Sequence, residues 1–201
     1  SEDGGDDVGT GADTTFVASG PVGTFGDTAG EARSLAAIVF ANTAGGGQRV
    51  VLTFADHEGL PANTVGPGRV ELLRDLGVVR VWLPKEVDAG AMTQTFWAAD
   101  LASDAYLVRA LDGGCFVDVH LRRAAEARLW ESTVPAAVVL ELRPGGEPMP
   151  DPAPRNRSVV LLAPRGGEAS YPLEIGGYAR TFEANVVLRL VQEGHAVRDT
   201  F

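Results

Sequence analysis

A proline-rich segment is the feature that most restricts how this 201-residue chain can fold. Residues 143–154 read RPGGEPMPDPAP and hold five prolines. Proline lacks a backbone N–H and fixes φ, so neither a helix interior nor a sheet interior can run through the segment. Closely spaced prolines favour an extended, semi-rigid spacer. The pattern predicts a linker over residues 144–157, between a β-patterned region at 16–143 and a shorter one at 158–201.

Both regions predict an all-β fold. Short apolar runs with β-branched residues are separated by glycine and proline about every ten residues, which is typical of antiparallel β-sandwiches. The run at 34–41 is expected to be a buried strand that forms a hairpin with 49–55, and 56–68 a loop. Two alternatives stay open: a helix over 70–76, and a helical turn or an irregular strand over 124–130. The other expected strands are 70–73, 78–83, 105–111, 115–121 and 137–142, then 159–163, 173–175 and 185–191.

The segment 105–121 contains the clearest hairpin. Asp112-Gly113 supplies the positive φ that a two-residue turn requires. In the second strand, period-two alternation places Cys115, Val117, Val119 and Leu121 on the core face, and Phe116, Asp118 and His120 on the opposite face.

Charge excludes several classes of partner. The net charge is −10 and the sequence pI is near 4.7, so nucleic acid and a direct anionic membrane surface are not expected partners. Five acidic and no basic residues lie in 1–15, a segment with too little apolar content to order itself. We expect a disordered acidic tether there. The sequence contains no apolar run of the length that a membrane span requires.

Candidate chemical groups are few, and no catalytic, cofactor-binding or metal-binding residue is expected. Cys115 is the only cysteine, which excludes a disulfide within the chain and predicts a small buried apolar side chain. Asp56-His57-Glu58 reads as a solvated loop. The three histidines (57, 120 and 195) lie in unrelated contexts and no Gly-x-Ser-x-Gly motif is present.

Four more residues are candidates for ligand binding. Glu183 lies in an apolar run and has either a structural role near a strand start or a place on a ligand surface. The tryptophans 82, 97 and 130 could stack on sugars, with Trp82 expected in the core and Trp97 in an exposed loop.

The first region resembles the AMIN-like domain of bacterial, chiefly actinobacterial, envelope lipoproteins. The residues that carry the resemblance are 48–54 (QRVVLTF), 78–84 (VVRVWLP), 106–120 and 135–142 (PAAVVLEL). Related amidase N-terminal domains are β-sandwiches that attach enzymes to peptidoglycan. The acidic segment at 1–15 is similar to the tether that follows the lipid-bearing cysteine of bacterial lipoproteins.

The second region resembles the start of the immunoglobulin-like domain of bacterial spore germination proteins. The resemblance rests on residues 160–168 (VLLAPRGGE) and on Gly177, Ala179 and Phe182-Glu-Ala184 in the family's order. Arg165 separates Pro164 from Gly166, where the family has a Pro-Gly turn. Because the family domain is about twice as long as 158–201, we expect an incomplete sheet that associates through its open apolar side.

Together these resemblances imply a non-enzymatic, extracytoplasmic lipoprotein of the cell envelope, with a lipid anchor upstream of Ser1. The expected partner is peptidoglycan or another envelope protein. Two alternatives stay open: a non-catalytic module of a cell-wall enzyme, and a module that binds only proteins.

Overall fold

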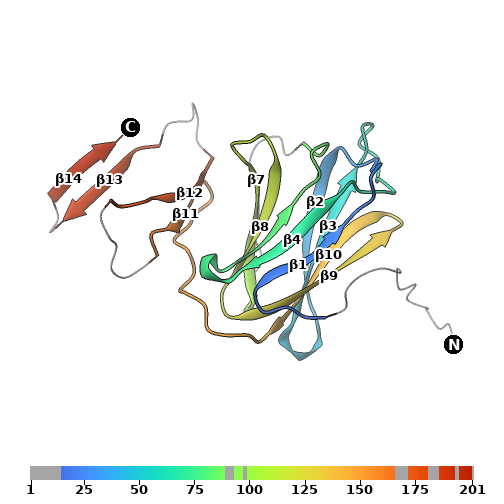
Figure 1. Cartoon of the computed structure of the whole chain (residues 1–201), viewed down its shortest axis with the longest axis horizontal. Helices are drawn as coiled ribbons and strands as arrows, with labels where there is room; N and C mark the ends of the chain where they lie inside the picture. Colours follow the sequence, from blue (N-terminus) through green and yellow to red (C-terminus); the bar gives the residue numbers. More distant parts are fainter. Residues whose placement is uncertain are drawn as a thin grey trace. The chain divides into compact units, whose positions relative to one another are not determined.

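The computed structural model describes residues 15–88, 93–96, 99–165, 172–180, 186–192 and 195–200. These residues confirm the all-β prediction, because they form several antiparallel sheets and only two single-turn 3₁₀ helices, η1 (Ala44–Gly46) and η2 (Arg74–Leu76) (Figure 1). The chain divides into two compact units, 1–152 and 153–201. None of the described helices is long and apolar enough to span a membrane. Of the predicted tether, all but Thr15 lies outside the described residues.

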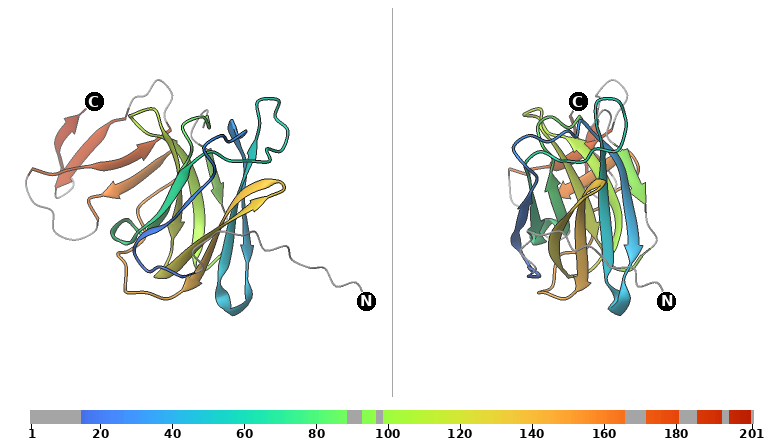
Figure 2. Two further views of the ribbon diagram at one scale, coloured as in Figure 1. Left: turned by 45° about the vertical axis from the view of Figure 1, so that its right-hand side comes forward. Right: turned by 90° about the vertical axis from the view of Figure 1, so that its right-hand side faces the viewer.

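The first unit contains two sheets (Figures 1 and 2). The larger sheet has the order β1-β4-β5-β8-β7-β6, and the smaller sheet has the order β2-β3-β10-β9. The larger sheet consists of β1 (Gly20–Phe25), β4 (Gly68–Leu73), β5 (Val78–Trp82), β8 (Cys115–Leu121), β7 (Ala102–Arg109) and β6 (Thr93–Phe96). The smaller sheet consists of β2 (Ser34–Asn42), β3 (Gln48–Ala55), β10 (Ala136–Pro144) and β9 (Ala125–Thr133).

One hydrophobic core joins the two sheets in a sandwich-like arrangement. Period-two alternation sends every second side chain of each central strand into it. The smaller sheet contributes Val50, Leu52 and Phe54 of β3 and Val138 and Leu140 of β10, while the larger sheet contributes Val79 and Val81 of β5 and Val117 and Val119 of β8. Each fully buried side chain of this size contributes about 1.5–3 kcal/mol of transfer free energy.

The structure resolves both open alternatives in favour of strands. At 70–76, β4 ends at Leu73, and only the single turn η2 follows before Gly77 reverses the chain with φ +61°. Strand β5, which follows Gly77, therefore runs antiparallel to β4. Residues 125–130 belong to β9, which begins one residue after Ala124, and its alternate residues Ala125, Ala127 and Leu129 enter the core.

The prediction of a buried strand at 34–41 is wrong about burial, because most of this strand is not buried. Residues Ser34–Asn42 do form β2, and β2 and β3 form the predicted hairpin. However, β2 is an edge strand of its sheet, and Phe40 is its only buried residue. An apolar run predicts a strand, but the position of that strand within the sheet decides how much of it is covered.

The β7–β8 hairpin is confirmed, but its turn is longer than predicted. Ala110 and Gly114 are joined by a backbone hydrogen bond of 2.7 Å, so the loop consists of Leu111, Asp112 and Gly113. Gly113 has φ +87°, which fits a type I turn followed by a left-handed residue. The predicted core face of β8 is confirmed, since Cys115, Val117, Val119 and Leu121 all belong to the core.

The proline-rich segment is not a free-standing spacer over its whole length. Pro144 is the last residue of β10, Glu147 forms an ion pair with Arg74, and Met149 packs against the core of the first unit. The division between the two units follows Pro152. The half-buried Met149 makes an apolar contact with the first unit, and the spacing of the prolines does not predict this contact.

The second unit contains two small antiparallel pairs. Strand β11 (Val159–Ala163) pairs with β12 (Gly176–Ala179), and β13 (Leu188–Gln192) pairs with β14 (His195–Thr200). The strand predicted at 173–175 is wrong, because pairing begins at Gly176. A Cβ on Gly177 would lie 2.1 Å from the carbonyl oxygen of Val160, so glycine permits this close pairing. The strand predicted at 185–191 begins at Leu188, and β14 was missed.

Candidate functional site

The outer face of the larger sheet carries a buried ion pair. Nε and Nη2 of Arg80 on β5 donate to the two carboxylate oxygens of Asp118 on β8 at 2.7 Å each, and Asp118 is fully buried. The guanidinium also stacks over the Phe116 ring at 4.2 Å. A paired and bidentate geometry is what makes a buried carboxylate tolerable. Because Asp118 is inaccessible to solvent, this pair is a structural element.

Trp82 extends this cluster, and its predicted place in the core is wrong. Val79 and Val81 point into the core, so Trp82 lies on the opposite face of β5 and is half-buried. Its ring centroid is 5.2 Å from that of Phe116, and the Arg69 guanidinium lies 4.8 Å from the Trp82 ring centre. The residues next to Trp82 in the sequence are apolar, but their side chains point to the opposite face of the sheet.

Polar residues of β7 and β8 are also buried on this face. His120 contacts Tyr106 edge to face with ring centroids 5.2 Å apart, and both residues are buried. Asp104 is buried as well, and the β7–β8 register pairs it with His120. Cys115 is buried, as predicted, but it points into the core on the other face of β8. The thiol and the imidazole therefore cannot form a nucleophile–base pair.

The outer face of the smaller sheet is more open, and we call it the Trp130 face. It comprises the outward side chains Val39, Arg49, Val51, Arg128, Trp130, Val139 and Glu141 together with Phe16. Strand register arranges most of these in two rows, one apolar (Val39, Val51, Val139, Trp130) and one charged (Arg49, Glu141, Arg128).

An arginine covers each of the two aromatic rings of the Trp130 face. The Arg49 guanidinium lies 5.3 Å from the centre of the half-buried Trp130 ring. Two backbone hydrogen bonds between Val17 and Ala127 place Phe16 beside β9. There the guanidinium groups of Arg128 and Arg143 lie 4.7 and 4.1 Å from its ring centre. These cation–π contacts hold the planar groups in fixed orientations.

Glu141 links the two arginines of the charged row. Nη2 of Arg49 donates to Oε1 at 2.8 Å, and Nε of Arg128 donates to Oε2 at 2.6 Å. Burial alone would raise the pKa of Glu141, but the hydrogen bonds and positive charges of Arg49 and Arg128 outweigh it and lower that pKa. The row therefore keeps two cations and one anion at neutral pH.

The other candidate residues of the sequence form no site within the part of the chain that the structure describes. The Asp56 carboxylate accepts hydrogen bonds from the backbone N–H groups of Glu58 and Leu60 at 2.8 and 3.0 Å, which fixes the local turn. His57 and Glu58 are exposed. Trp97 and Glu183 lie outside the described residues, and only the backbone of His195 is described. The described residues contain no cluster of three or more potential metal ligands.

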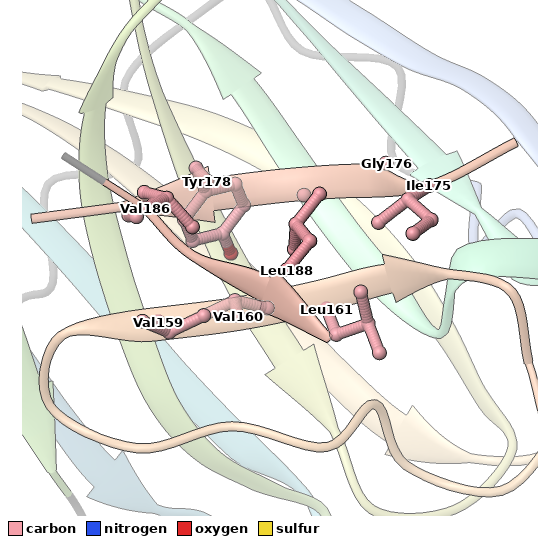
Figure 3. A pocket seen from close by; sticks show the side chains of 10 residues that line it. Val159, Val160, Leu161, Ile175, Gly176, Tyr178, Val186 and Leu188 are labelled. Atoms are coloured by element: carbon pink, nitrogen blue, oxygen red, sulfur yellow. The ribbon is translucent and has the colours of Figure 1, made fainter. Parts of the chain in front are cut away.

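The second unit has an apolar cleft of about 240 Å³ between its two small sheets. In Figure 3, Leu188 lies between Tyr178 and Ile175 on one side and Leu161 on the other. Val159, Ile175, Val186 and Leu188 are all exposed. The lining is Val159, Val160, Leu161, Ile175, Gly176, Gly177, Tyr178, Ala179, Val186 and Leu188. Such a lining suits an apolar side chain or strand better than a polar ligand.

No protein-family model, curated protein or solved structure matches this chain significantly. The AMIN-like and immunoglobulin-like identities therefore stay proposals. The sequence pointed to Trp130 as one of three tryptophans that could stack on sugars, with Trp97 favoured among them, and it missed Phe16, Arg49, Arg128 and Glu141. Alternating charged and apolar residues in 125–131 (AEARLWE) would have indicated the outward side of β9.

Proposed function

We propose that this chain is a non-enzymatic binding module of the bacterial cell envelope, and that the Trp130 face binds peptidoglycan. In this proposal the first unit is an AMIN-like sandwich and the second an immunoglobulin-like domain. The observation that carries the proposal is the pairing of Trp130 with the charged row of Arg49, Glu141 and Arg128 on one open sheet face.

Each part of the Trp130 face suits a part of the polymer. The sugar rings of a glycan strand present C–H groups of partial positive charge, and these suit the part of the half-buried Trp130 indole that the Arg49 guanidinium leaves exposed. The peptide stems carry carboxylates, for which the planar guanidinium fork is the preferred donor. In the described part of the chain Arg49 and Arg128 share the single carboxylate of Glu141, which does not occupy all of their N–H donors, so both retain donors for a ligand.

Binding of purified peptidoglycan sacculi to the Trp130→Ala variant tests the proposal. Buried aromatic anchors of binding sites often contribute 2 kcal/mol or more, so we expect binding at least about 30-fold weaker in cosedimentation. Leu111→Ala is the matched control, because Leu111 is fully exposed on the β7–β8 hairpin, away from the Trp130 face. Equal binding by Trp130→Ala and the wild type, with both folded by circular dichroism, would exclude the Trp130 face as the site.

A second candidate is a protein-binding module, which the apolar cleft of the second unit favours. Within the described residues each small sheet has two strands, and sheets of that size rarely persist without a further strand or covering layer. The cleft between them is open and apolar, so a β-strand of another envelope protein is the occupant that fits it. A strand bound in this cleft would be the kind of association that the sequence predicts for the second region.

A further inference from the structure

We infer that the acidic segment at residues 1–15 is an intramolecular ligand of the Trp130 face, where it competes with external anionic ligands for the arginines. The segment has five acidic and no basic residues, although the whole chain has 17 basic residues. Two arginines, Arg49 and Arg128, belong to the Trp130 face, and Phe16 joins the segment directly to it. Opposite charges held close together attract one another, so the segment and the face are complementary.

Arg143 adds to the positive charge beside the Trp130 face. It is the next outward residue of β10 after Glu141, and it lies opposite Glu126 of β9. Its Nε donates to Oε2 of Glu126 at 2.6 Å. Among the described residues, the outward charges of this sheet are three arginines and two glutamates, which leaves one positive charge in a chain of net charge −10. Such a region attracts carboxylates.

Each of the three arginines keeps donors for a further carboxylate. The exposed fractions of the side chains of Arg49, Arg128 and Arg143 are 42%, 35% and 54%. A guanidinium has more N–H donors than one carboxylate uses, and the bonds to Glu141 and Glu126 leave the Nη1 group of each arginine without a described partner. Nε of Arg49 is buried and also lacks a partner among the described residues. Carboxylate is an acceptor that this planar fork binds well.

Phe16 fixes the end of the acidic segment beside these arginines. The backbone groups of Val17 and Ala127 exchange two hydrogen bonds of 2.8 and 2.9 Å, which hold the chain against β9. The Phe16 ring centre then lies 4.7 Å from the Arg128 guanidinium. Asp13 comes three residues before Phe16, so covalent geometry alone keeps their Cα atoms within about 11 Å of one another. The first carboxylate of the segment is therefore always close to an arginine of the face.

The other carboxylates of the segment can reach across the whole face. Asp7 lies nine residues before Phe16, and nine extended residues span up to about 32 Å. Arg49 is on β3, two strands from β9, which corresponds to roughly 10 Å at the usual strand spacing. Tethers of this length give effective concentrations of millimolar order. Single exposed ion pairs are weak, so an external ligand with several anionic groups can displace the segment.

The acidic segment regulates which external ligands bind. This consequence rests on the function proposed above only for the identity of the external ligand. A carboxylate-bearing ligand must displace the segment from the guanidinium groups, so its apparent affinity is reduced by the fraction of molecules in which the face is free. A polymer that contacts several arginines at once overcomes this competition, whereas a single anion does not. The segment therefore makes the Trp130 face selective for polyanions.

Binding of a fluorescent peptide with the sequence of residues 1–14 tests the inference without peptidoglycan. Two full-length variants with the same net charge are compared by fluorescence anisotropy at low salt, so general repulsion of the acidic peptide is equal. The segment variant is Glu2→Gln/Asp3→Asn/Asp6→Asn/Asp7→Asn/Asp13→Asn. The control variant neutralises five exposed carboxylates outside the Trp130 face, as Glu58→Gln/Asp75→Asn/Glu86→Gln/Asp100→Asn/Glu174→Gln.

We expect the segment variant to bind the peptide at least about 3-fold more tightly than the control variant. A 3-fold difference corresponds to a segment that occupies the face about two-thirds of the time. Raising the salt concentration to about 0.5 M should remove the difference, because it screens exposed charges.

Arg143→Gln, added to the segment variant, locates the contact. We expect it to weaken peptide binding at least about 3-fold, since it removes one of the three guanidinium groups. Arg69→Gln is the matched control, because the side chain of Arg69 is 55% exposed, close to the 54% of Arg143, and lies outside the Trp130 face. Circular dichroism establishes that all variants are folded.

Three results would overturn the inference. One is equal peptide binding by the segment variant and the control variant. A second is a segment variant that binds no peptide at millimolar concentration. A third is an equal effect of Arg143→Gln and Arg69→Gln, which would place the peptide elsewhere.

Cosedimentation with sacculi separates this inference from the proposed function. Stronger binding by the segment variant than by the control variant supports both. Equal binding together with a positive peptide result would contradict peptidoglycan as the external ligand, while the intramolecular contact would stand.

Discussion

Arg80 and Asp118 lie 38 positions apart in the sequence and are joined by two hydrogen bonds of 2.7 Å across neighbouring strands. The carboxylate is fully buried, whereas the arginine is partly exposed. Removing one partner of a buried ion pair costs far more than replacing both, because a charge is left without its counter-charge.

We therefore predict that Arg80→Met lowers the free energy of unfolding by about 3–5 kcal/mol. The double variant Arg80→Met/Asp118→Leu should recover much of that loss, since it removes both charges. Urea unfolding followed by circular dichroism measures both values. A loss below about 1 kcal/mol in Arg80→Met would show that the ion pair contributes no more than an exposed one.

Glu141 should make stability depend on pH. Its pKa in the folded chain is below the ordinary value of 4.5, owing to Arg49 and Arg128. A depressed carboxyl pKa contributes stability above the unfolded-state pKa, and this contribution is lost as the pH falls through the folded-state pKa. We predict that the stability difference between the wild type and Glu141→Gln shrinks between about pH 6 and pH 3.

Urea titrations of both proteins at several pH values measure this difference. Arg69→Gln provides a control, because Arg69 is an exposed arginine outside the Trp130 face. A difference between wild type and Glu141→Gln that is constant across this pH range would contradict the predicted linkage.

Gly113 should resist substitution by a β-branched residue. It has φ +87°, and a Cβ there would meet no atom within 4 Å, so the cost comes from the backbone alone. We predict that Gly113→Val lowers stability by about 1 kcal/mol or more. Gly113→Asn should cost less, because asparagine tolerates the left-handed region. Equal melting temperatures for the valine variant and the wild type would contradict the turn geometry.

The cleft of the second unit should bind an apolar probe. The dye ANS fluoresces on exposed apolar surface. We predict that Leu188→Lys reduces its fluorescence, since Leu188 lines the cleft. Val187→Lys is the matched control, because the adjacent Val187 is exposed but does not line the cleft. Equal loss in both variants would show that the dye binds elsewhere.

The sequence by itself determined the kind of structure and much of its local pattern. Period-two alternation in residues 115–121 identified the core face of β8, because side chains of a strand must point to opposite sides. Gly113 indicated a reversal of the chain, since the freedom to adopt the left-handed conformation is a property of glycine itself. The burial of Cys115 followed from its place in the same alternation.

Tertiary structure decided which strands lie at edges and which side chains meet across strands. The apolar composition of β2 predicted a buried strand, but the strand order places β2 at an edge of its sheet. Trp82 lies outside the core because its neighbours Val79 and Val81 occupy the inner face. The contacts of Arg80 with Asp118 and of Phe16 with Arg143 join residues far apart in sequence. Such contacts depend on strand register, which local propensity does not encode.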